Sequence, residues 1–297
     1  MQTRNNKAYV MLVLATLFWS CNFIVGKVIT VFNIPPLSFT FFRWALVWVI
    51  LFPFEIKEVF YKRKYILKNI FFLSLLALTS VSTFNSVVYY SLNFTQVLNA
   101  VLMISTIPVV IIFFSSLFKV EKTNLNQLMG LIVSLLGVLV IITRADINKL
   151  TSLNFNEGDL WMLIAVVAWA VYSSLLKKRH ISLTPFAFIF VIVTIGLLFL
   201  LPQFLLEYSH DYKVSLDLPF VLSLIFVAIF PSMGSYYFWF SSISIIGANR
   251  SGIFLHLMPI FGAIMAMIIF KEKFLIFHLI GAILIISGIY LSGKKQK

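Results

Sequence analysis

Residues 249–291 read NRSGIFLHLMPIFGAIMAMIIFKEKFLIFHLIGAILIISGIYL. This stretch contains two apolar segments joined by a short charged turn, Lys271-Glu272-Lys273. The same pattern occurs 151 positions earlier, and the identical pairs are Pro259 and Pro108, Glu272 and Glu121, Lys273 and Lys122, Gly281 and Gly130, and Gly288 and Gly137. Five identities at one spacing indicate an internal duplication.

The beginnings of the two halves also correspond, at a spacing of 150, because Trp19 matches Trp169 and Lys27 matches Lys177. We therefore predict a first repeat over 1–147 and a second over 148–297. If each repeat crosses a bilayer five times, the second copy enters the membrane from the opposite side. Such inverted repeats are typical of secondary transporters, in which one repeat rocks against the other.

The composition is that of an integral membrane protein. Of its 297 residues 61% are hydrophobic and 11% are charged, with a mean hydropathy of +1.02, whereas soluble domains have about 45–50% apolar and about 25% charged residues. The net charge of +13 would suggest nucleic acid for a soluble chain. Here the basic residues lie in short turns between apolar runs, so we predict no nucleic-acid partner.

Ten segments are long and apolar enough to cross a bilayer, which takes about 20 residues. We predict helices, because hydrocarbon forces the backbone to form its hydrogen bonds internally. The fold class expected is thus an all-α integral membrane protein with ten transmembrane helices in two inverted five-helix repeats. The predicted spans are 8–31, 37–54, 69–90, 95–118, 125–143, 159–176, 184–206, 218–240, 248–270 and 275–291.

Lysine and arginine residues predict the orientation. The basic turn 57–68, the cluster 177–179 and the C-terminal tail all fall on the same side as the N-terminus. The positive-inside rule then places both termini in the cytoplasm of a multi-pass protein of the cell (inner) membrane. The single cysteine, Cys21, excludes an internal disulfide and a cysteine-rich metal site.

Polar side chains within membrane spans usually face the bundle interior or a cavity, because they are costly in hydrocarbon. The third span has a stripe of such residues at helical spacing, from Thr79 through Ser82, Ser86 and Tyr89 to Asn93, which favours a wet pathway; helix packing is the alternative. The full set of substrate-binding candidates is Trp19, Asn22, Arg43, Asn85, Tyr89, Asn99, Trp169, Tyr172, Tyr236, Trp239 and His256.

Charges and prolines refine this prediction. All Asp and Glu residues lie in turns or at span ends, so with Arg43 and Lys27 the pocket should be neutral to positive. Such a pocket favours neutral, zwitterionic or carboxylate solutes.

His256 is either a hydrogen-bonded structural residue or the carrier of a coupling proton. Pro108 and Pro259 free the carbonyls of the residues four positions earlier and either kink the helices near a ligand or only bend them.

These residues resemble the EamA-type permeases of the drug/metabolite transporter superfamily. The resemblance rests on 19–23 (WSCNF) with Lys27, on Pro36 followed by Phe42-Arg43, and on the two Pro…Glu…Gly…Gly blocks. It implies a ten-helix bundle with a central cavity formed by both halves. Small multidrug relatives depend on a glutamate in the first span, and this chain has none there.

The expected function is secondary transport of a small polar organic solute, such as an amino acid or related metabolite, by alternating access, with export favoured by the resemblance. A drug or cation exporter and a membrane solute sensor are the alternatives. We expect no enzyme, catalytic group, metal or cofactor, because only His256 and scattered serines are present; membrane lipid surrounds the bundle. Glu121 and Glu272 are expected to fix helix ends or gate contacts rather than to bind solute.

Overall fold

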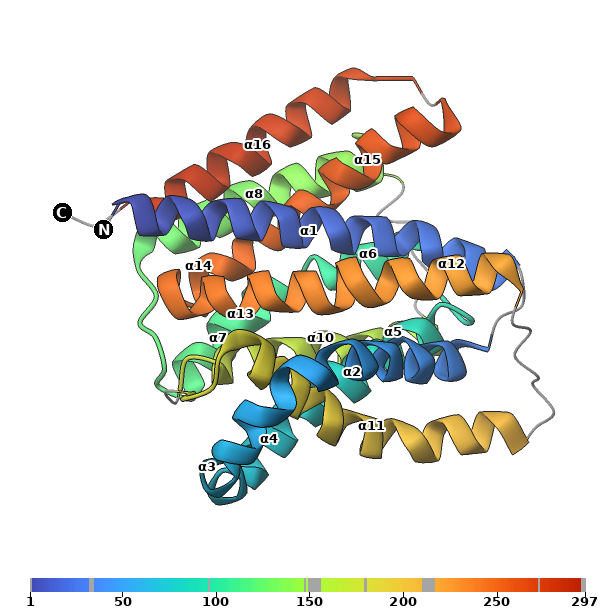
Figure 1. Ribbon diagram of the computed structural model, residues 1–297. Coiled ribbons are helices and arrows are strands. Elements are labelled where there is room, and N and C mark those ends of the chain that lie inside the picture. Colours follow the sequence, from blue (N-terminus) through green and yellow to red (C-terminus); the bar gives the residue numbers. More distant parts are fainter. Residues whose placement is uncertain are drawn as a thin grey trace.

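The computed structural model describes residues 2–31, 35–95, 97–146, 148, 156–178, 181–209, 217–271 and 273–294. Their regular structure is helical throughout, without a strand in these ranges (Figure 1). The first half contains α1 (Gln2–Val31), α2 (Pro36–Tyr61), α3 (Arg63–Lys68), α4 (Ile70–Ala77), the π-helix η1 (Leu78–Phe84), α5 (Asn85–Ser91), α6 (Val97–Ile104), α7 (Ile107–Leu117) and α8 (Leu125–Thr143).

The second half contains α10 (Glu157–Leu175), α11 (Pro185–Ser209), α12 (Leu218–Val227), the π-helix η2 (Ala228–Gly234), α13 (Ser235–Ile246), α14 (Ala248–Ile253), the 3-10 turn η3 (Phe254–His256), α15 (Leu257–Phe270) and α16 (Ile276–Gly293). Within the described residues, nine continuous helical segments are long and apolar enough to cross a membrane. They correspond to predicted spans two to ten, and α1, with 30 residues, is the first. The predicted fold class is confirmed, while the boundary at 147/148 stays a prediction.

The two repeats share an irregularity that periodicity alone did not indicate. The π-helices η1 and η2 each have seven residues and occupy matching positions 150 apart. In η2, Pro231 has no amide and cannot continue α-helical bonding. In η1, the side-chain amide of Asn85 donates to the carbonyl of Ser80 at 2.6 Å, which satisfies an acceptor that the wider turn leaves open. π-helical turns of this kind are frequent at functional sites.

Corresponding helices of the two repeats pack in pairs, α2 against α11 and α8 against α16 (Figure 1). The α8–α16 pair is built on glycine. A Cβ on Gly130 would lie 2.4 Å from the carbonyl oxygen of Gly288, and one on Gly137 would lie 2.6 Å from that of Gly281. The helices are thus antiparallel. The repeat relates Gly130 to Gly281 and Gly137 to Gly288, so exchanging the two repeats turns one of these contacts into the other. Small residues let backbones approach this closely inside a membrane.

The α2–α11 pair is joined at both ends by a carboxylate. Glu58 near the end of α2 accepts from the amide and hydroxyl of Thr184, which precedes α11, at 2.9 and 2.8 Å. Glu207 near the end of α11 accepts from the amides of Leu37 and Ser38 at the start of α2, at 3.2 and 2.6 Å. Each carboxylate satisfies donors that a helix start leaves without partners. The two contacts lie at opposite ends of the pair and mirror the inverted repeat.

Candidate functional site

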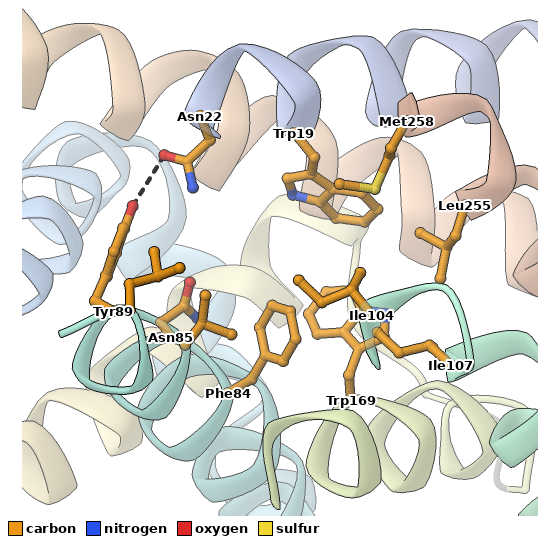
Figure 2. A pocket seen from close by; sticks show the side chains of 12 residues that line it. Trp19, Asn22, Phe84, Asn85, Tyr89, Ile104, Ile107, Trp169, Leu255 and Met258 are labelled. Atoms are coloured by element: carbon orange, nitrogen blue, oxygen red, sulfur yellow. Dashed lines mark hydrogen bonds between the residues drawn. The ribbon is translucent and has the colours of Figure 1, made fainter. Parts of the chain in front are cut away.

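A cavity of about 60 Å³ lies in the middle of the bundle, bounded by helices from both repeats (Figure 2). It is small beside ligand pockets, which have volumes of about 300–1,000 Å³. The walls must therefore move apart before an organic solute can enter. The lining residues are Trp19, Asn22, Phe84, Asn85, Val88, Tyr89, Leu92, Ile104, Ile107, Trp169, Leu255 and Met258.

The two indoles that the repeat relates form the aromatic wall of the cavity. Trp19 and Trp169 meet edge to face with ring centroids 5.2 Å apart, and Phe84 packs on Trp169 at 4.6 Å. The indole N–H of Trp19 donates to the carbonyl of Pro231 at 3.0 Å. That carbonyl belongs to η2, so the irregular helix of the second repeat orients the tryptophan of the first.

A hydrogen-bonded chain forms the polar end of the cavity. The hydroxyl of Tyr89 donates to Oδ1 of Asn22 at 2.9 Å, as drawn in Figure 2. Behind it Nη1 of Arg43 donates to the same hydroxyl at 3.3 Å, and Nε donates to Oγ of Ser232 at 2.6 Å. Arg43 is only 1% exposed, so a full positive charge is buried with neutral hydrogen-bond acceptors. Arg43 does not line the cavity itself and is connected to it by the hydroxyl of Tyr89.

Asn85 links the cavity to the second repeat. Its amide donates to the hydroxyl of Tyr236 at 3.1 Å, and that hydroxyl donates to the carbonyl of Ser80 at 2.9 Å. Tyr236 is buried and stays behind the cavity wall. The carbonyl of Ser80, freed within η1, thus receives donors from both repeats.

Two more predicted residues support the aromatic wall from behind. Tyr172 and Trp239 have ring centroids 5.2 and 5.9 Å from that of Trp169. Trp239 donates its indole N–H to Oγ of Ser173 at 3.2 Å. The structure therefore brings these residues to the site as packing partners and does not place them on the cavity surface.

The other two predicted residues lie away from the cavity. His256 is fully buried, with Nδ1 2.7 Å from Oγ of Ser134 and Nε2 3.0 Å from the carbonyl oxygen of Ser105. Ser105 occupies the break between α6 and α7, the position that corresponds to His256 itself. The carbonyl of Ser105 follows directly after that of Ile104, which Pro108 frees, and a side chain of the protein occupies it.

Asn99 donates to Oδ2 of Asp159 at 3.1 Å, and Thr95 donates to Oδ1 of the same carboxylate. Asp159 is 1% exposed. Asp159 does lie at the start of a span, as the sequence predicts, but the conclusion that no carboxylate is buried is wrong. The reason is a capping box: the Asp159 carboxylate also accepts from the amide of Asn156 at the start of α10. The signal was visible as the pair Asn156 and Asp159 before an apolar run.

Of the polar stripe in the third span, only Tyr89 lines the cavity. Thr79 bonds back to the carbonyl of Leu75, and Ser82 accepts from Gln203 of α11. The stripe assumed 3.6 residues per turn throughout, whereas η1 widens the helix in its middle. The face that does line the cavity contains Phe84, Val88 and Leu92 beside Asn85 and Tyr89. Its apolar members are spaced as on one face of a helix. Lipid-facing residues have the same spacing, so the sequence alone does not identify these residues as cavity-lining.

The side chain of Lys27 and all of Glu272 lie outside the described parts of the chain. Within those parts, no three His, Cys, Asp or Glu side chains are close enough together to hold a metal ion.

The chain belongs to the EamA-like transporter family, whose profile matches it twice, over 6–143 and 156–293. A protein of Archaeoglobus fulgidus named as an uncharacterized transporter is 30% identical, over 98% of this chain and 99% of its own length. YyaM of Bacillus subtilis, also named as a transporter, is 24% identical over 95% and 92%. A crystal structure with 16% identity has a TM-score of 0.77 over 97% of this chain and 96% of its own, which shows the same fold. The chain is accordingly a multi-pass membrane transporter.

Proposed function

We propose that the protein carries a small organic solute with an apolar body and a carboxylate group, by alternating access. Amino acids and related metabolites have this chemistry. The cavity walls support the proposal: Trp19, Phe84 and Trp169 would contact the apolar body. The polar end at Asn22 and Tyr89 would receive the carboxylate. On the family resemblance, we propose export as the direction.

The observation that carries this proposal is the buried Arg43, whose hydrogen bonds go to the neutral hydroxyls of Ser232 and Tyr89. Among the described residues no carboxylate pairs with Arg43. A buried charge without a counter-ion is costly and is retained in membrane proteins mainly at functional positions. A solute carboxylate that replaces Asn22 as the acceptor of the Tyr89 hydroxyl would lie one hydroxyl group away from the guanidinium of Arg43. Lipophilic cations would be repelled there, although the aromatic walls alone could bind them.

The test is a thermal-shift screen of the purified protein with amino acids, carboxylates, nucleosides and polyamines, followed by counterflow in proteoliposomes. A ligand that binds the folded state raises the apparent melting temperature. We expect zwitterions or acids to raise the melting temperature. Arg43→Gln should raise the dissociation constant of such a ligand about tenfold or more, because a charge-assisted contact is lost. Arg63→Gln, which removes an exposed guanidinium at the α2–α3 turn, is the matched control.

Stabilisation by polyamines alone would contradict this assignment and favour the exporter of cations. A ligand that stabilises the protein but never exchanges across sealed vesicles would favour a sensor.

A further inference from the structure

Glu121, in the turn after α7, binds the start of α14 in the other repeat. Its two carboxylate oxygens accept from the amides of Ala248 and Asn249, both at 3.1 Å. The side-chain amide of Asn249 donates in addition to Oγ1 of Thr123 at 3.2 Å. The first amides of a helix have no intrahelical acceptors, and a carboxylate there also interacts favourably with the helix dipole.

The backbone before α14 is shaped for this carboxylate. Gly247 has φ of +88°, a conformation that side chains rarely adopt. A Cβ at this position would lie 2.1 Å from Oε1 of Glu121. Only glycine therefore permits both the turn from α13 into α14 and the approach of the carboxylate.

The helix that Glu121 holds closes the bundle on the side where α1 begins. Ser242 near the end of α13 donates to the carbonyl of Ala8, and Tyr9 stacks on Phe254 of η3 with centroids 5.5 Å apart, so the segments on both sides of α14 contact the first turns of α1. The helix α14 itself packs mainly against α7 and α13. Asn249, Ser251 and Ile253 are fully buried.

The cavity lies farther along the bundle. It is lined by Trp19 and Asn22, which are eleven or more residues beyond Ala8, or about 16 Å along α1 at 1.5 Å per residue. The same broken helix connects both places, because Leu255 and Met258, just after α14, are cavity-lining residues. Moving α14 would therefore both open this face and change the cavity wall.

We propose that Glu121 is a latch: it holds α14 in the closed position on the face where α1 begins, and it must release the two amides before solute can pass there. The inference rests on the proposed alternating-access function. Glu121 is half-buried, so water can replace the amides when the contact opens. The cavity of about 60 Å³ is consistent with a closed conformation that has to open before a solute moves.

The test uses a reporter cysteine, Met258→Cys, in full-length protein with Cys21→Ser. Vesicles of both orientations are labelled with a membrane-impermeant maleimide. Glu121→Ala should raise the labelling rate from the α1-start face about tenfold, the shift expected when charge-assisted contacts are lost. Glu58→Ala is the matched control, since its carboxylate also binds an amide and a hydroxyl across the repeats but lies on α2, away from the cavity.

An unchanged rate in Glu121→Ala, or an equal rise in Glu58→Ala, would overturn the latch. If Glu121→Ala does not fold, Glu121→Gln is used instead, because the amide keeps the size of the side chain and one acceptor oxygen but loses the charge and the second acceptor. Glu121→Gln should also raise labelling of the reporter from this face, by about threefold; no increase would overturn the proposal. Labelling needs no solute, so a protein that shows the latch but no flux would contradict only the proposed transport function.

Discussion

At the scale of single residues, the buried hydroxyls around the site differ in the number of hydrogen bonds that they form. Tyr236 donates to Ser80 and accepts from Asn85. The hydroxyl of Tyr172 is buried and, among the described residues, has no hydrogen-bond partner. A buried polar group without a partner costs about 1–3 kcal/mol, whereas a satisfied one contributes about 1 kcal/mol.

The two tyrosines therefore make a matched pair for mutation. Tyr172→Phe should leave the thermal stability unchanged or raise it, because it removes an unsatisfied hydroxyl. Tyr236→Phe should destabilise the protein by about 1–3 kcal/mol, because it leaves Ser80 and Asn85 without that partner. Melting temperatures in detergent measure both effects. A larger loss in Tyr172→Phe than in Tyr236→Phe would contradict the hydrogen bonding described.

His256 has a hydrogen-bond partner at each ring nitrogen. A carbonyl can only accept, so Nε2–H donates to Ser105, while the hydroxyl of Ser134 lies 2.7 Å from Nδ1 and 3.0 Å from the carbonyl of Leu131, and its single proton serves one of these two acceptors. We expect His256→Gln to lower stability by about 1–3 kcal/mol and to leave the pH dependence of flux unchanged. Flux measured between pH 5 and 8 checks this, with Ser134→Ala as the control that removes one partner. Loss of the pH dependence only in His256→Gln would identify this residue as the carrier of a coupling proton.

At the scale of elements, helix irregularities and close glycine contacts place the residues of the site. The carbonyl of Pro231 in η2 accepts a hydrogen bond from the indole N–H of Trp19, and the carbonyl of Ser80 in η1 accepts one from the hydroxyl of Tyr236. Each repeat thus offers a carbonyl of its π-helix to a side chain of the other repeat. The α8–α16 pair packs against the broken helix α14–α15 and depends on glycine backbones in contact.

Gly130→Ala tests that contact. Its Cβ would lie 2.4 Å from the backbone of Gly288, and since backbone cannot yield cheaply we expect a loss of about 1–3 kcal/mol from overpacking. Gly262→Ala is the control, because a Cβ there meets nothing within 4 Å, and alanine favours helix over glycine by about 1 kcal/mol. Melting temperatures should fall for the first variant and not for the second. Equal effects would contradict the glycine-mediated packing.

At the scale of the whole molecule, packing between the repeats restricts the motion that can produce alternating access. Carboxylates join α2 and α11 at both ends, and Trp48 donates to Thr194 midway at 3.0 Å. Rocking of one intact repeat against the other would have to separate this pair. The broken helices, among them α14–α15, are the elements able to move without doing so.

A cross-link between α2 and α11 distinguishes these motions. With Cys21→Ser, the pair Trp48→Cys and Thr194→Cys can be bridged with a bifunctional thiol reagent. We expect solute exchange to keep more than about half of its rate, because the two helices should move together as neighbours in one rigid pair. The same reagent on each single-cysteine variant is the control. Abolished exchange, restored by reduction, would instead support rocking of whole repeats.

The sequence alone determined the membrane class, the helical spans and the duplication, since hydrophobic length and repeated identities are local properties that hydrocarbon converts directly into helices. It also indicated Trp19, Asn22, Asn85, Tyr89 and Trp169, which line the cavity. The orientation of the termini and the repeat boundary stay predictions.

Tertiary structure alone decided that Arg43 lies behind Tyr89, that His256 bonds the carbonyl of Ser105 at the break between α6 and α7, and that Asp159 is buried. The physical reason is that a hydrogen-bond partner in another helix, and a π-turn that shifts a helix face, depend on contacts between distant segments, which periodicity along one segment does not contain.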